Sequence, residues 1–104
     1  MSQQVHINFK MSVSGYFLTY IELLRFLDSM NPYNENIHNF SISIEQNISN
    51  KLFLVNCSFN TKDYGEDSVL NYLINTWEGE NKVHSYNGKT IIITIDKTKY
   101  SYKK

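Results

Sequence analysis

Residues 5–13 read Val-His-Ile-Asn-Phe-Lys-Met-Ser-Val, and this stretch decides the class of the fold. Apolar and polar side chains alternate strictly along it. A period of two is typical of a β-strand with one face against a hydrophobic core and the other in solvent. Such a strand needs partner strands and a covering layer, so the sequence predicts a sheet with one buried face.

The segment that follows, residues 14–30, is predicted to be a helix. Ser14 or Gly15 provides an N-cap, and Asn31-Pro32 ends the helix. Apolar side chains lie nearly all the way round it. This pattern favours cover on more than one side, by the sheet and then by a second helix or a partner.

Two further strands are predicted over residues 40–45 and 51–59. A polar loop, residues 33–39, precedes them, and turn residues 46–50 separate them. In the second of these strands Leu52 and Leu54 share one face, which favours a central position. The other face carries Phe53, Val55, Cys57 and Phe59. Because Cys57 has apolar neighbours on its face, it is expected to be buried and unreactive.

The second half of the chain predicts a helix and a hairpin. Residues 63–67 lead into the helix, and Gly79 ends it. Asn87-Gly88 indicates a β-hairpin between residues 83–86 and 90–95, because both central residues of a type I′ turn have positive φ. A solvated, partly disordered segment is one interpretation of the Lys- and Tyr-rich tail, residues 97–104, and whether this tail is ordered stays open.

Together these elements predict one α+β domain over residues 1–104, in the order βαββαββ. The sheet has about five strands and is mostly antiparallel, and right-handed crossovers put both helices on one face. The first six elements resemble the ferredoxin-like split βαβ arrangement, with one hairpin strand appended. The order of the last two strands in the sheet stays open.

Composition limits the compartment and the partners. Ten basic and ten acidic residues cancel, so the chain lacks the uniform positive field of a general nucleic-acid binder. Its N-terminus has no basic and apolar pattern of a signal peptide, and its most apolar stretch, residues 16–30, carries charges and is too short to cross a bilayer. With one cysteine as well, a cytoplasmic location without membrane contact is expected.

No set of residues has the spacing of a catalytic or metal site. His6, His38 and His84 do not pair at ligand spacing, and the four glycines stand singly at turns. We therefore expect no enzyme activity, metal or cofactor. RNA binding stays an alternative, because Phe53 or Phe59 could stack on bases if the helices covered the opposite face of the sheet.

Charge by position suggests a partner-binding surface. Between residues 63 and 80 there are five acids and no base, and Tyr64 lies among them as an apolar anchor. Helix capping and solubility would explain some of these acids. The functional interpretation is that they complement a basic surface on another protein. The predicted contact residues are Asp63, Tyr64, Glu66, Asp67, Glu78 and Glu80.

In size, in its Asn-, Ile- and Lys-rich composition and in its lack of an active site, the chain resembles the small immunity proteins that bacteria make against contact-dependent or polymorphic toxins. The resemblance implies a tight one-to-one complex that blocks a toxin domain, often a nuclease with a basic cleft. Phage-encoded inhibitors of host defence share these features, so that function stays an alternative. A ligand-sensing domain and a homo-oligomer joined through edge strands or the first helix stay open as well.

Overall fold

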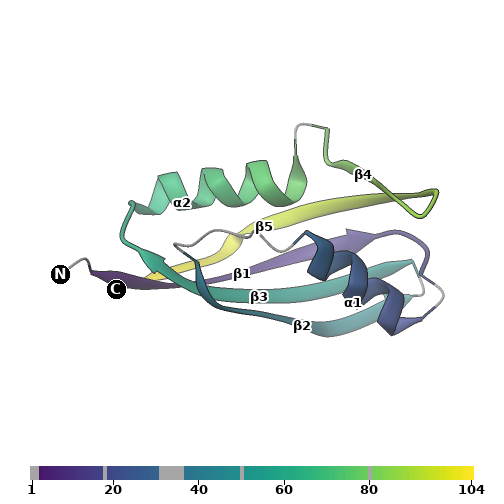
Figure 1. Ribbon diagram of the computed structural model, residues 1–104, viewed down its shortest axis with the longest axis horizontal. Helices are drawn as coiled ribbons and strands as arrows, with labels where there is room; N and C mark the ends of the chain where they lie inside the picture. Colours follow the sequence, from purple (N-terminus) through teal and green to yellow (C-terminus); the bar gives the residue numbers. More distant parts are fainter. Residues whose placement is uncertain (1–2, 18, 31–36, 50, 80) are drawn as a thin grey trace.

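The computed structural model describes residues 3–17, 19–30, 37–49, 51–79 and 81–104. They form a five-stranded sheet and two helices, an α+β architecture as predicted (Figure 1). The elements are β1 (Gln4–Ser14), α1 (Tyr20–Ser29), β2 (His38–Ser49), β3 (Leu52–Lys62), α2 (Glu66–Leu73), a π-helical turn (Ile74–Glu78), β4 (Val83–Tyr86) and β5 (Lys89–Lys103). Neither helix is long and apolar enough to cross a membrane within the described ranges.

The strand order of the sheet differs from the expected one. The strands lie in the order β2-β3-β1-β5-β4, and every neighbouring pair is antiparallel. A ferredoxin-like match of the first six elements would place β4 beside β1, but β5 takes that position and β4 lies at the edge. The reason is burial: β5 has 15 residues and β4 only 4. Of these two strands, β5 supplies a buried apolar row, which consists of Ile91, Ile93 and Ile95, and β4 does not.

Both helices pack on one face of the sheet. This face carries the apolar side chains of β1, which are all buried: Val5, Ile7, Phe9, Met11 and Val13. The Trp77 ring, just after α2, lies 6.3 Å from the Phe9 ring. On the same face, the Tyr20 ring of α1 lies 6.3 Å from the Phe53 ring of β3. The prediction of two helices on a single face is therefore confirmed.

β3 is an internal strand, as its two-sided apolar pattern predicted. It lies between β2 and β1. Phe53, Val55, Cys57 and Phe59 are buried in the core, whereas Leu52 and Leu54 point to the other face and are half-buried.

Burial also determines the chemistry of the lone thiol. It raises the pKa of Cys57 to about 12, so almost no thiolate forms near neutral pH. We expect a thiol reagent to label the native protein slowly and the denatured protein fast. Fast labelling of the native protein would contradict the position of Cys57 in the core.

α1 is shorter and more exposed than the sequence suggested. It begins at Tyr20, because the Thr19 side chain accepts a hydrogen bond from the Glu22 backbone N–H and caps the helix there; Ser14 belongs to β1. Its C-terminal end at Ser29 agrees with the prediction, whereas Asn31-Pro32 lies outside the described residues. Only its inner side is buried, through Leu23, Phe26 and Leu27. The expected cover of a second side by a neighbouring helix is absent from the described chain.

The turn signals in the second half of the sequence are confirmed. Gly79 follows the π-helical turn with φ of 73° and donates its N–H to the Ile74 carbonyl. Asn87 and Gly88 have φ of 52° and 74° and join β4 to β5. Positive φ at both central residues is the type I′ geometry expected of an Asn-Gly hairpin.

The predicted tail is an ordered part of the sheet. β5 continues to Lys103, and Tyr102 pairs with Ile7 of β1. A register shift separates this part of β5 from the part that pairs near Lys10. Tyr100 and Tyr102 pack against the core, which supplies the burial that holds the lysine-rich segment. The order of the tail, which the sequence left open, thus follows from its pairing in the sheet.

Candidate protein-binding surface

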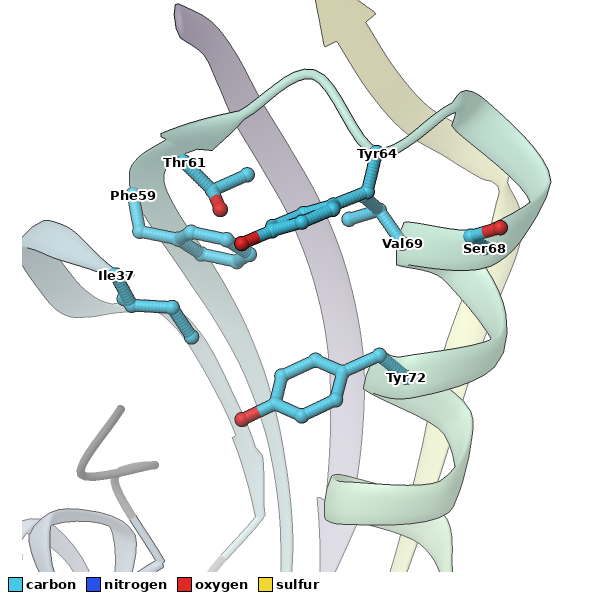
Figure 2. A pocket seen from close by; sticks show the side chains of 7 residues that line it. All are labelled: Ile37, Phe59, Thr61, Tyr64, Ser68, Val69 and Tyr72. Carbon is cyan, nitrogen blue, oxygen red and sulfur yellow. The ribbon is translucent and has the colours of Figure 1, made fainter. Parts of the chain in front are cut away.

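An open apolar pocket lies beside α2. Its volume is about 310 Å³, near the lower end of the range for ligand pockets. Figure 2 shows Tyr64 and Tyr72 extending from the α2 side toward Ile37 at the start of β2, with Phe59 near Tyr64. The lining consists of Ile37, Phe59, Thr61, Tyr64, Ser68, Val69 and Tyr72.

Tyr64 lines this pocket, and two exposed acids follow it in the first turn of α2. Tyr64 is 49% exposed, although its ring lines the pocket. Glu66 and Asp67 follow in the first turn of α2, and both are exposed. Their charges act on Tyr100 of β5. Burial is the main reason why the pKa of Tyr100 lies above its ordinary value, and the charges of Glu66 and Asp67 raise this pKa further. The start of α2 is therefore locally negative and carries an exposed aromatic ring.

Asp63 is held by contacts within the chain. Its carboxylate accepts hydrogen bonds from the Tyr102 hydroxyl and from the Gly65 backbone N–H. The Lys104 Nζ lies 3.2 Å from its other oxygen. These contacts join the start of α2 to the end of β5. Asp63 is thus a connector between two elements more than a free contact residue.

The pKa of Asp63 predicts a pH-dependent contribution to stability. It lies below its ordinary value, first because of the Tyr102 hydrogen bond and then because of Lys104. A carboxylate with a lowered folded-state pKa stabilises the fold above its unfolded pKa, near about 4, and this stabilisation is lost as the pH falls through the folded pKa. Asp63→Asn is therefore expected to lower the melting temperature at neutral pH. The difference from wild type should shrink in acid.

Melting curves between neutral and acid pH check this expectation. Asp67→Asn is the matched control, because it removes an exposed acid nearby. A difference between wild type and Asp63→Asn that stays constant with pH would show that the carboxylate charge plays no part.

Glu78 does not belong to the predicted surface. It is 2% exposed, and its Oε1 accepts the Ile95 backbone N–H at 2.8 Å. Lys82 approaches the other oxygen at 3.8 Å. Its inclusion among the contact residues is corrected for this reason. Glu80, the last predicted contact residue, lies outside the described residues.

Sequence reasoning missed most of the pocket. Ile37 lies in the segment that the sequence predicts to be a polar loop, residues 33–39. Tyr72 lies one helical turn after Ser68, which gives it the same helix side; this spacing was the one available signal. The contribution of β2 and β3 depends on long-range packing, which spacing along the chain does not record.

Two of the three histidines have side-chain contacts within the fold. His6 Nδ1 lies 2.8 Å from Asn60 Oδ1, and His84 donates a hydrogen bond to the Trp77 carbonyl over 2.8 Å. Within the described ranges, no group of three His, Cys, Asp or Glu side chains could hold a metal ion. The aromatic residues that the RNA-binding alternative required, Phe53 and Phe59, lie in the core under the helices. They are not available for base stacking.

No family model, curated protein or solved structure matches this chain.

Proposed function

We propose that this chain is a non-catalytic binding protein that neutralises a cognate toxin domain in the cytoplasm, as an immunity protein does. The observations that carry the proposal are the apolar pocket beside α2, which the exposed Tyr64 lines, and the exposed acids Glu66 and Asp67 in the adjoining first turn of α2. Protein interfaces combine aromatic anchors and apolar pockets with a charged rim. The segment at the start of α2 has these parts near one another along the chain: Tyr64 lines the pocket, and Glu66 and Asp67 follow it within three residues.

The surface suggests the chemistry of the partner. Glu66 and Asp67 are exposed and negative, and they follow Tyr64, which precedes the helix, by two and three residues. A basic surface that presents an apolar or aromatic side chain would fill the pocket and meet these acids. Complementary charge raises the association rate and aligns the partners. Toxin nucleases with basic substrate clefts fit this description.

Two substitutions at this surface are expected to weaken partner binding. Tyr64→Ala with Asp67→Ala removes the aromatic anchor and one rim charge, and roughly a tenfold loss of affinity is expected, equal to about 1.4 kcal/mol. Neither side chain is buried, so the melting temperature should change little. The matched control is Tyr16→Ala with Glu45→Ala, which removes an exposed tyrosine and an exposed acid that do not line this pocket.

The partner is first captured from the native strain with the wild-type protein, and its affinity for both double variants is then measured. Equimolar wild-type protein should suppress the toxic activity of the captured partner. Unchanged affinity of the Tyr64/Asp67 variant at low salt would contradict the proposed surface. Capture of a host-defence protein would assign the same surface to a phage-type inhibitor, and capture of RNA with steep salt dependence would contradict protein binding.

A further inference from the structure

α1 leaves an apolar side uncovered. Ile21 is 61% exposed and Leu24 is 44% exposed, and Tyr20 beside them is also exposed. Their spacing along the helix puts them on one side. A helix side of this kind in a small domain is normally buried. The part of the chain that the structure describes does not cover it.

A groove follows this side of the helix. It has a volume of about 410 Å³ and lies between α1 and β2. Phe40 and Ile42 form its floor and remain only partly buried, because β2 is the edge strand of the sheet. The lining residues are Ile21, Leu24, Arg25, Asp28, Phe40 and Ile42.

We propose that a second copy of this chain fills the groove. Two copies associate about a two-fold axis with their α1 helices antiparallel, so that Ile21 and Leu24 of each copy contact Phe40 and Ile42 of the other. An isologous interface requires one patch that is complementary to itself. This groove meets that requirement. Ile21 and Leu24 form the wall of the groove in their own copy, and the same two side chains would fill the groove of the other copy.

The charges at the groove favour a second copy over another partner. Arg25 and Asp28 are exposed, have opposite signs and lie three residues apart. Neither has an ion-pair partner among the described residues. In the antiparallel arrangement, Arg25 of each copy comes within reach of Asp28 of the other. A purely basic or purely acidic partner would oppose one of the two with a like charge.

The charge of the whole chain agrees with self-association. Ten basic and ten acidic residues give a net charge of zero, so two copies do not repel each other at long range. The proposed interface lies on α1 and β2, whereas the toxin-binding surface lies at α2. The two proposals can therefore fail separately.

Sedimentation of the full chain over a range of concentrations tests the proposal. We expect a concentration-dependent dimer in the wild type and a monomer in Leu24→Asp, since a buried carboxylate would lack a partner. Arg25→Asp should weaken the dimer roughly tenfold, because it sets like charges against each other. The swap variant, Arg25→Asp with Asp28→Arg, restores opposite charges and should restore the dimer. Leu24, Arg25 and Asp28 are all exposed, so these substitutions should leave the monomer folded. Circular dichroism and the melting temperature of the monomers check this.

Ile92→Asp is the matched control. Ile92 is an exposed apolar residue of β5 and lies on the sheet face without helices, because it pairs with Ser14 of β1. The Ile92→Asp variant should form the dimer at the same concentrations as wild type. A monomeric wild type up to the solubility limit would overturn the proposal, and so would a dimer that survives Leu24→Asp or is lost in Ile92→Asp. A swap variant as weak as Arg25→Asp alone would overturn the antiparallel pairing of the charges.

Discussion

Replacement of Trp77 by alanine is expected to lower the free energy of unfolding by about 3–5 kcal/mol. Trp77 is fully buried, and its ring stacks on Phe40 with centroids 5.8 Å apart and an angle of 8°. It also contacts Phe9 of the central strand. The side chain thus joins the end of α2 to the edge strand and to the middle of the sheet. A domain of this size has about 5–15 kcal/mol in total, so the variant should be only marginally folded.

Trp77→Phe is the matched control for this prediction. It keeps an aromatic ring for the contacts with Phe9 and Phe40. It also removes the indole N–H, which has no hydrogen-bond partner among the described residues and carries a desolvation penalty when buried. A clearly smaller loss than in Trp77→Ala is therefore expected. Urea unfolding followed by circular dichroism measures both variants, since Trp77 is the chain's one tryptophan; a loss under about 1 kcal/mol in Trp77→Ala would contradict the proposed role in the core.

Replacement of Glu78 by alanine is expected to lower the free energy of unfolding by about 1–3 kcal/mol. The carboxylate accepts the Ile95 backbone N–H, and Ile95 itself is 3% exposed. Without Glu78 this donor would be left without its partner in the core. Glu78→Gln retains an oxygen acceptor but not the charge facing Lys82, so a smaller loss is expected.

Glu66→Ala is the control for the Glu78 series, because it removes an exposed glutamate from α2. Its stability should stay within about 0.5 kcal/mol of wild type. The comparison separates a buried structural acid at the end of the helical segment from an exposed acid at its start. Equal effects of Glu66→Ala and Glu78→Ala in denaturant unfolding would contradict the buried hydrogen bond to Ile95.

The candidate surface was only partly predictable from sequence. The acids between residues 63 and 80 have no base among them along the chain, and this suggested one continuous acidic patch. In the structure, Lys104 lies at Asp63 and Lys82 approaches Glu78. Lys104 is distant from Asp63 in sequence, and burial of Glu78 depends on its contact with β5. Tyr64, Glu66 and Asp67 remain exposed, because β5 contacts the start of α2 through the Glu66 carbonyl and Asp63 and leaves these three side chains in solvent.

What the sequence determined by itself is the local structure and the facing of side chains. Alternation in β1 and β3 selects the buried face, because a shift of one residue would turn each apolar row into solvent. Asn87-Gly88 determined the hairpin, since few residues adopt positive φ at both turn positions. These signals lie within a few residues, so they could be interpreted without long-range contacts.

Only the tertiary structure decided the strand order, the fate of the tail and the cover of α1. β5 lies beside β1 because its long apolar row can be buried there, and the short β4 cannot supply one. Tyr100 and Tyr102 order the lysine-rich end through packing and through hydrogen bonds to the start of α2. The exposed side of α1 follows from the position of α2 over another part of the sheet. Each of these outcomes is a competition between distant segments for the same buried area, and spacing along the chain does not record which segment wins.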